Sequence, residues 1–404
     1  MTIGTGVAKQ VIYKAESTWN TAAGASSAQR LRRVASDLNL KKDTFESNEI
    51  VTTYQRSDFR HGLRRVEGSI NGELSPGTWK DFIAAACRRA FAAVTPSASI
   101  AITIAGSGPT YTVTRGSGSW LTDGEKVGQV GRLSVGSLNA ANINKNLLIV
   151  NISSATAMTV MPLNGVALVA EGPISGCTWT STGKTTYVPT TGHTDTSFSI
   201  EQYYSDLTLS ELFTGCKIDQ MDFSLPPSGM AGISTKFLGG DVTTAGSAYF
   251  SSPTAETTTG ILAGVNGILA IEGSKIATLT GLNFSIKGSM SGEAVIGSTT
   301  YADIAEGRVL VDGSFTALFD SATLRDYFIN ETEVGLICAL SASPSATADF
   351  MSFSFPRIKV GGADKNDGEK SLIQTLPFTA LYNSAGGSGV KTEQSTFAVQ
   401  DSQA

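Results

Sequence analysis

The stretch that decides the fold is Val66-Glu67-Gly68-Ser69-Ile70-Asn71-Gly72-Glu73-Leu74-Ser75-Pro76-Gly77-Thr78. Residues 63–74 alternate between two faces, with Val66 and Ile70 on one of them, which indicates a strand buried on one side. Directly afterwards, apolar side chains recur at the spacing of one helix face, at Trp79, Phe82, Ile83, Ala86, Cys87 and Ala90. The sequence therefore predicts a strand that runs straight into an amphipathic helix.

The predicted helix carries signals at both ends. Ser75 suits the N-cap, because its hydroxyl can accept a backbone N–H, and Pro76 suits the first helical position. Arg88 and Arg89 fall in the predicted last turn, where cations are favoured by the helix dipole. Pro96 ends the segment.

The strand-to-helix pattern returns in the last third of the chain. Val311-Asp312-Gly313-Ser314-Phe315 echoes residues 66–70, and Asp326-Tyr327-Phe328 echoes residues 81–83 without a gap. Further upstream, Leu38-Asn39-Leu40 matches Leu282-Asn283-Phe284 at nearly the same offset. We interpret the chain as two copies of one strand-rich domain with a single packing helix.

Composition narrows the class of protein. The chain has 404 residues, enough for two or three domains of about 150 residues each. Only 16% of the residues are charged and 43 are glycine, with Ser and Thr also abundant, which is typical of strands and turns. No run approaches the roughly 18 apolar residues of a spanning helix, and the N-terminus lacks the features of a signal peptide. We expect a β-rich protein with no membrane segment and little ionic chemistry.

The net charge of −5 conceals an asymmetry. Residues 1–95 carry more Lys and Arg than Asp and Glu, whereas the remainder is acidic. A basic end can contact nucleic acid or another polyanion, or it can face a complementary surface on a second copy. Because acids are interleaved with the bases, we favour self-association.

The fold class that we expect is mainly β, with two tandem sandwich or barrel domains, each with one packing helix, and an inserted small β domain. The first domain takes residues 1–95 and 173–243, and the second takes residues 260–404. The insert takes residues 96–172, where charges are scarce and short alternating runs stand between turns. Residues 244–259, rich in Ser, Thr and Gly, form a linker.

One polar stretch, Lys41–Gly62, is unusually long for a connection inside a domain, where the median is about five residues. It follows a strand that we predict over residues 32–40. Its isolated aromatic and β-branched residues argue for docking onto another surface, with the charges in exposed ion pairs. We therefore predict a contact loop between subunits or rings, made by Phe45, Glu46, Glu49, Ile50, Tyr54, Arg56, Asp58, Phe59 and Arg60.

The candidate catalytic and metal-binding motifs of the sequence are incomplete. The four cysteines are far apart and form no paired motif, so we expect buried free thiols. His61 and His193 are the only histidines, and each is expected in a surface loop without a ligand-like neighbour. The segment 181–185 lacks a glycine that a P-loop needs, and Asp364–Gly368 breaks the spacing of a calcium loop and indicates a hairpin tip. We expect no catalytic residue, no metal and no cofactor.

Several segments resemble tail tube proteins of long-tailed, non-contractile phages, the siphoviruses. The resemblance is carried by residues 33–50 and 57–62, by the deciding stretch 66–78, and by the late segment 368–381. It covers about the first 95 residues well and the rest loosely, and residues 96–170 depart from the family pattern.

The resemblance implies β-sandwiches whose sheets join around a ring, a flanking helix, and a long loop that reaches the neighbouring ring. It implies six tube domains per ring, so two such domains in one chain lead to a trimeric ring with pseudo-sixfold symmetry. The expected partners are further copies of the chain, the tape measure, tail terminator and tail tip proteins, and genomic DNA that passes without specific binding. The expected location is the virion tail, assembled in the host bacterial cytoplasm.

Two consequences of the resemblance concern surfaces. We expect the insert to project outward from the tube. We also expect Asp and Glu to outnumber Lys and Arg on the lumen, because cations that neutralise phosphates create affinity for DNA.

Three other functions remain open. A tail-tip or baseplate hub adaptor would use the same domains in a single ring. A carbohydrate-binding or host-binding protein would need aromatic platforms, for which the insert offers Tyr111 and Trp120. A hydrolase would need an assembled acid, base or nucleophile, and no such group is evident in the sequence.

Overall fold

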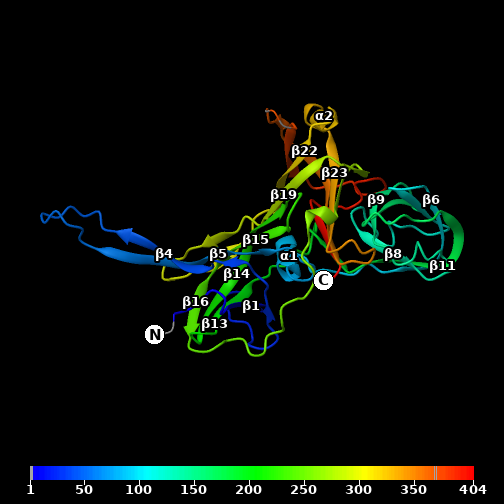
Figure 1. The fold of residues 1–404 in the computed structure, drawn as a ribbon. Coiled ribbons are helices and arrows are strands. Elements are labelled where there is room, and N and C mark those ends of the chain that lie inside the picture. Colours follow the sequence, from blue (N-terminus) through cyan, green and yellow to red (C-terminus); the bar gives the residue numbers. More distant parts are fainter. Residues whose placement is uncertain (1–2, 368, 370) are drawn as a thin grey trace.

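The computed structural model describes residues 3–367, 369 and 371–404. Its elements fall into a first unit, a barrel and a second unit (Figure 1). The first unit comprises β1 (Lys9–Ala15), β2 (Gln29–Arg30), β3 (Ala35–Ser36), β4 (Asn39–Glu46), β5 (Phe59–Glu73), α1 (Lys80–Cys87), β12 (Lys184–Tyr187), β13 (Phe198–Tyr204), β14 (Leu209–Leu225), β15 (Gly232–Gly239) and β16 (Asp241–Ala245).

The barrel interrupts the first unit after α1, and the second unit follows β16. The barrel comprises β6 (Ser97–Ala105), β7 (Tyr111–Arg115), β8 (Val130–Ser134), β9 (Leu147–Ile152), β10 (Ala157–Pro162) and β11 (Glu171–Ser181). The second unit comprises η1 (Gly264–Asn266), β17 (Gly267–Ile271), β18 (Ser274–Lys275), β19 (Leu279–Lys287), β20 (Ser291–Glu293), β21 (Asp303–Ala305), β22 (Leu310–Leu318), α2 (Thr323–Ile329), β23 (Glu333–Ser341), β24 (Phe350–Val360), β25 (Asp364–Lys365), β26 (Ile373–Ala380) and β27 (Ala398–Asp401).

The two units share one topology. Their strands pair in the order β1-β13-β14-β15-β5-β4 in the first and β17-β23-β24-β26-β22-β19 in the second. A helix follows the equivalent strand in each, α1 after β5 and α2 after β22. A bulge between Phe198 and Ile200 recurs between Val334 and Leu336. The expected fold class, two tandem β units with one helix each and an inserted β domain, is confirmed.

One sheet runs through both units without a break. Along it β4, β5, β15 and β14 of the first unit are followed by β19, β22, β26 and β25 of the second. The joint is the antiparallel pair β14–β19, from Gln220 opposite Lys287 to Leu225 opposite Leu282. We call this continuous sheet the inner sheet.

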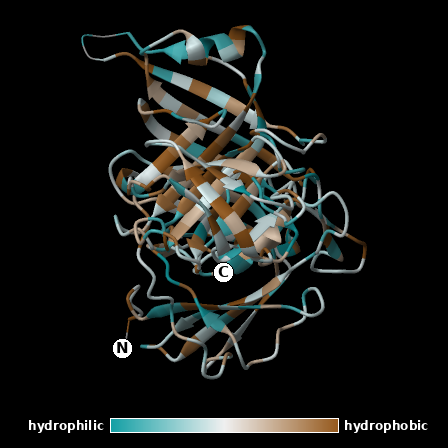
Figure 2. Ribbon diagram, turned by 90° about the vertical axis from the view of Figure 1, so that its right-hand side faces the viewer, coloured by the Kyte–Doolittle hydropathy of each residue, from teal (hydrophilic) through white to brown (hydrophobic). Residues whose placement is uncertain are grey.

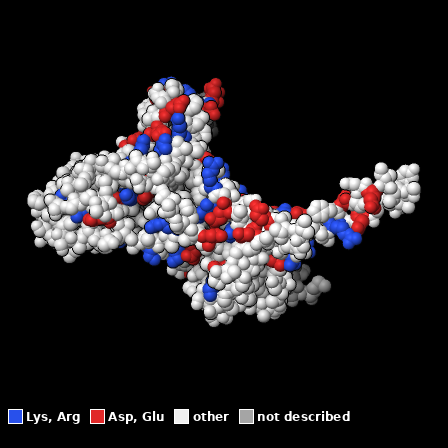
Figure 3. Space-filling model, turned by 180° about the vertical axis from the view of Figure 1, so that it is seen from behind, with Lys and Arg blue, Asp and Glu red and all other residues white. Residues whose placement is uncertain are grey.

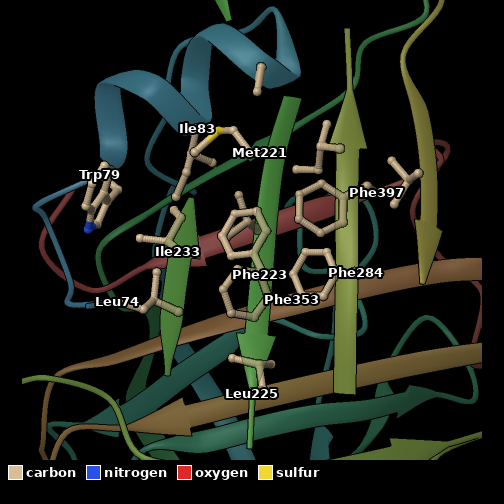
Figure 4. Packing of buried hydrophobic residues seen from close by; sticks show 14 of the residues in the cluster. Leu74, Trp79, Ile83, Met221, Phe223, Leu225, Ile233, Phe284, Phe353 and Phe397 are labelled. Atoms are coloured by element: carbon tan, nitrogen blue, oxygen red, sulfur yellow. The ribbon is translucent and has the colours of Figure 1, made fainter. Parts of the chain in front are cut away.

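A single hydrophobic core lies under the inner sheet and spans both units. Phe223 of β14 stacks on Phe284 of β19 with ring centroids 4.5 Å apart, and Phe353 of β24 packs against both rings. Figure 4 shows these rings below α1, which contributes Ile83 and is preceded by Trp79. Because the aromatic cluster draws on both units, burial couples the two copies into one body.

The barrel shares its core with the second unit. Ile268, Ile337, Ala339 and Phe350 of the second unit belong to the same buried cluster as the barrel residues. Hydrophobic strand residues gather at the centre of the molecule in the view with the barrel toward the reader (Figure 2). The barrel is therefore packed against the second unit over an apolar contact.

Two predicted segments differ from the structure near residue 40. The strand predicted over residues 32–40 is broken into β3 and β4, because the Asp37 carboxylate accepts the Ser69 N–H and Oγ–H. The predicted polar loop Lys41–Gly62 is mostly hairpin: β4 continues to Glu46 and β5 begins at Phe59. His61 therefore lies on a strand and not in a loop.

The helix ends also differ from the prediction. Gly77 has φ +76°, outside the helical region, and donates its N–H to the Asp401 carboxylate, while the Ser75 and Thr78 hydroxyls contact each other. Helix α1 thus begins at Lys80, and neither Ser75 nor Pro76 caps it. Arg88 is the left-handed C-cap, with φ 57°, and lies outside the last turn with Arg89.

The pairing corrects two further details. The barrel runs to Ser181 in β11, past residue 172, where we expected the insert to end. Asn39 pairs with Glu67 as Ser285 pairs with Asp312, so Asn39 is equivalent to Ser285 and not to Asn283. The match between residues 38–40 and 282–284 is thus two residues out of register, which leaves the same face buried.

Candidate assembly interface

A long hairpin arm, residues 42–62, extends away from the body on the side opposite the barrel and consists of the ends of β4 and β5 with the segment that joins them (Figure 1). Its strands pair with Phe45 opposite Arg60 and Glu46 opposite Phe59. All nine residues predicted for the contact loop lie on this arm. The structure thus places them together on one projection, in strands and at a turn.

The apolar side chains of the arm are exposed. Ile50 and Tyr54 at the tip are each fully accessible (101%), and Phe45 and Phe59 are 61% and 46% exposed. Gly62 leaves room for Phe45, because a Cβ at this position would lie 2.2 Å from the Phe45 ring. Apolar groups held out on a paired ribbon are typical of a docking surface.

The charged side chains of the arm form two ion pairs within the arm. Arg56 pairs with Glu46 at 2.8 Å, Arg60 with Asp58 at 2.7 Å, and the Ser57 hydroxyl donates to Glu49 at 3.5 Å. These pairs lie behind the tip, which Figure 3 shows free of charged atoms. The tip is therefore apolar and the stem is internally paired.

The second unit holds the equivalent segment in another conformation. Residues 288–307, which we call the folded-back loop, carry the short pair β20–β21 and pack against the first unit. Thr299 accepts the backbone N–H of Arg64, and Gly288 accepts from the Arg88 guanidinium at 3.1 Å. The same position in the two units is thus an extended arm in one and a docked loop in the other.

A buried lysine anchors the folded-back loop. Lys217, with a side chain only 2% exposed, donates to Asp195 at 2.7 Å and to the Ile304 carbonyl at 2.8 Å, with Asp303 at 3.6 Å. Beside it Arg88 pairs with Glu306 at 3.2 Å, and burial raises the pKa of the Glu306 carboxyl. The ammonium is therefore fully partnered, as a buried charge must be.

Both ends of the inner sheet are open. In the described part of the chain, β4 pairs on one side only, with β5, and β25 on one side only, with β26. An open strand edge presents unpaired N–H and C=O groups that can add a further strand. The molecule thus has two sheet edges available for another chain.

The uncovered face of the inner sheet is polar. A shallow hollow of ≈ 620 Å³ lies over its middle, lined by Ser224, Ser234, Asn283, Ser285 and Ser314 among others. The lysines there are neutralised, Lys236 by Asp222 at 3.5 Å and Lys287 by Asp312 at 3.2 Å. The face therefore offers hydroxyl and amide groups with charges in matched pairs.

Two carboxyl groups are buried near the contacts of the barrel and the C-terminus. Burial raises the pKa of Glu125 to about 7, although the Ser181 hydroxyl donates to it at 2.6 Å. Burial also raises the pKa of Asp401 to about 6, against hydrogen bonds from the Gly77 and Gln403 N–H groups. Burial thus shifts both carboxyl groups toward their neutral forms, relative to an exposed carboxyl group.

The Glu125→Gln variant is expected to be more stable than the parent at pH 8, by about 2–3 kcal/mol. The folded-state pKa of about 7 exceeds the ordinary value of 4.5, so ionisation of Glu125 destabilises the fold as pH rises through this interval. Below pH 4.5 both side chains are neutral and the difference should vanish. Calorimetric melting from pH 4 to pH 8 measures it; a difference that does not change with pH would contradict the assignment.

Sequence reasoning missed Lys217, its carbonyl partner Ile304, and the open edge at β25. The signal lay just upstream of the matched stretch, where Asp303-Ile304 and Gly307 stand at the same distance before Val311 as Asp58-Phe59 and Gly62 stand before Val66. The repeat therefore includes the base of the arm.

Features of other functional classes are limited. All four cysteines are free and buried, as expected. Among the described residues, no group of three or more His, Cys, Asp or Glu is arranged to hold a metal ion. In the same part of the chain, neither helix has the length and apolar character to cross a bilayer.

Comparison with known proteins identifies a family. A family model described as phage tail tube protein matches residues 6–380. No curated protein matches the chain. The matched range contains the arm, the joint between the units and both open edges.

Proposed function

The chain belongs to the phage tail tube protein family, a family of structural virion proteins that assemble with one another and with other tail proteins, and from this premise we propose that it forms trimeric rings. The rings stack into a conduit through which genomic DNA is ejected. Each ring has pseudo-sixfold symmetry, because every chain supplies two tube units, namely the first unit and the second unit.

The observation that carries the proposal is the β14–β19 joint. Within one chain, the C-terminal half of β14, beyond its pairing with β13, already pairs with β19, the edge strand of the second unit. The equivalent edges at the two ends of the inner sheet, β25 and β4, are open in the described chain. Repeating the same joint between chains closes a ring and covers both open edges of the inner sheet.

We call the joint between neighbouring chains of the ring the seam. Its register follows from the equivalence of the two units. Asp222 pairs with Ser234 and Ser285 in the joint. Asp364 is equivalent to Asp222, because Thr375, its partner, occupies the position of Ser234 in the repeat. Since Asn39 is equivalent to Ser285, Asp364 of one chain lies opposite Asn39 of the next.

The polar face of the inner sheet suits the lumen. Helices, core and barrel lie on its other side, so a ring with an open channel turns this face inward. Paired lysines offer few free cations to phosphates, which suits DNA that passes without binding. Around these two ion pairs, the acidic and basic side chains balance each other. The excess of Asp and Glu that we expect on the lumen must therefore come from residues elsewhere on the face.

The arm suits the contact between rings. Stacking is a head-to-tail contact between different surfaces of identical chains, which extends as a filament. The apolar tip supplies the anchor, and its three copies per ring bind together. The barrel, with few charged atoms on the face seen in Figure 3, is placed on the outside.

The tape measure, tail terminator and tail tip proteins are the further partners we propose, with assembly in the host cytoplasm and location in the virion tail. A tail-tip or baseplate hub adaptor is the second candidate, because one ring without stacking would use the same edges. A glycan-binding role loses its expected platforms, because Tyr111 and Trp120 are 3% and 0% exposed.

The test is electron microscopy of the purified protein at increasing concentration. We expect hollow filaments of stacked rings with three-fold symmetry and three arms per ring. Single rings at every concentration would favour the hub adaptor. A monomer at high concentration would contradict both.

A further inference from the structure

We propose that Lys359, with its partner Glu331, forms an open socket on the second unit that receives Asp58 and Phe59 from the base of the arm of the next copy of this chain. The inference rests on the proposed ring and adds to it the side-chain contact that fixes the seam. Its basis is a filled version of the same socket inside the chain, at Lys217.

Strand pairing establishes that Lys359 is the counterpart of Lys217. Lys217 lies opposite Leu238 of β15, which lies opposite Glu67 of β5. Lys359 lies opposite Thr379 of β26, which lies opposite Asp312 of β22. Glu67 and Asp312 occupy the same position of the repeat, so the two lysines do as well.

The two lysines also share a first partner. Lys217 donates to Asp195 at 2.7 Å, and Lys359 donates to Glu331 at 2.6 Å. Asp195 stands three residues before Phe198, the first residue of β13, and Glu331 stands two residues before Glu333, the first residue of β23. A lysine with an acid beside it is thus built into the same place twice.

The two sockets differ in what covers them. Over Lys217 lies the folded-back loop, whose Ile304 carbonyl accepts the ammonium while Asp303 flanks it. The Lys217 side chain is 2% exposed, whereas the Lys359 side chain is 40% exposed. In the described chain, Lys359 has the acid of the socket and lacks the covering segment.

The internal repeat identifies the segment that would cover Lys359. Asp303-Ile304 and Gly307 of the folded-back loop stand in register with Asp58-Phe59 and Gly62 of the arm. Ile304 is fully buried, whereas Phe59 is 46% exposed, with the His61 ring edge-on to it. The arm base therefore carries the residues that fill the socket, with Phe59 in the place of Ile304.

The open sheet edges place the cover over the socket. When Asn39 of one chain pairs opposite Asp364 of the next, the arm base of the first follows β4 across the edge beside Lys359, as the folded-back loop follows β19 beside Lys217. The Lys359 ammonium then donates to the Phe59 carbonyl, and Asp58 flanks it. The tip of the arm remains free to reach another ring.

The experiment compares the assembly of the full chain with that of three variants, by sedimentation and electron microscopy. Lys359→Glu is expected to raise the concentration needed for rings more than about tenfold, because it repels Asp58 and leaves the Phe59 carbonyl without its donor. Adding Asp58→Lys should recover part of the loss, because it turns the repulsion between the two side chains into attraction. Lys275→Ala, at an exposed lysine outside the seam, is the matched control and should assemble like the parent.

Melting of the monomeric variants separates assembly from folding. Lys359 is partly exposed, so a small change in melting temperature together with lost assembly supports the socket. If Lys359→Glu does not fold, Lys359→Met, which also removes the ammonium group, replaces it in the assembly test. Assembly of Lys359→Glu at the parental concentration overturns the socket, as does a failure of Asp58→Lys to recover any of the loss. If the parent protein forms filaments, either of these two results contradicts only the socket and not the proposed function. A parent protein that never forms rings contradicts the proposed function itself.

Discussion

A chain that carries Asn39→Cys and Asp364→Cys is expected to run as a covalent trimer on a denaturing gel without reductant once rings have formed and been oxidised. Monomer should remain the only species when the same protein is oxidised below its assembly concentration. This is the largest effect that we predict, because a closed ring links every chain to two neighbours and leaves no free end.

The physical reason is the geometry of an antiparallel pair. Directly opposed residues have Cβ atoms about 4.5–5.5 Å apart, close enough for a disulfide after small adjustment. The seam repeats the β14–β19 joint, in which Asp222 opposes Ser285. The four native cysteines are buried and free, so the background of other disulfides is low.

Two matched controls accompany the seam pair. Asp222→Cys with Ser285→Cys tests the same geometry inside one chain and should give an internal disulfide in monomer and ring alike. Asn39→Cys with Asn366→Cys places the cysteines opposite only if the seam slips by two residues, and it should stay uncoupled. A strong trimer band from the slipped pair, or its absence from the seam pair in visible rings, would show that the register is wrong.

The double variant Ile50→Ser, Tyr54→Ser is expected to form rings that do not stack. Both side chains are fully exposed at the arm tip, so their removal leaves the fold intact. A buried aromatic anchor is worth about 2 kcal/mol or more at an interface, and three arms act together in each ring contact. Filaments should therefore disappear at concentrations where the parent polymerises fully.

Light scattering and electron microscopy measure this loss of stacking. Val135→Ser is the control, because Val135 is also apolar and exposed (61%) but lies on the barrel, away from both proposed contacts. Equal filament lengths for the arm variant and the parent would remove the tip from the ring contact. Loss of the rings themselves would instead place the tip in the seam.

The arm shows where the local sequence pattern predicts a strand and where it does not. Alternation in residues 63–74 predicts β5 correctly, because one face of that strand packs on the core. The preceding residues 41–62 look like a loop, since neither face of a projecting ribbon is buried and the apolar pattern is lost. Their strand character comes from pairing with each other across the hairpin, which no local pattern records.

The start of helix α1 fails for a different reason. Ser75 and Pro76 have the residue types of a helix start, yet Gly77 is held in a left-handed conformation by the distant Asp401 carboxylate. A contact between residues so far apart in the chain overrides a local preference worth about 1 kcal/mol. The helix therefore starts at Lys80.

By itself the sequence determined the β-rich class, the repeat of the strand-to-helix motif and the location of an inserted β domain, because these rest on periodicity and on the order of residues along one chain. Only the tertiary structure decided that the two units form one sheet through β14 and β19, that the same segment is an extended arm in one unit and a folded-back loop in the other, and that Lys217 is buried while Lys359 is exposed. These features depend on which segments meet in space, and two copies of one motif acquire different surroundings when each packs against a different neighbour.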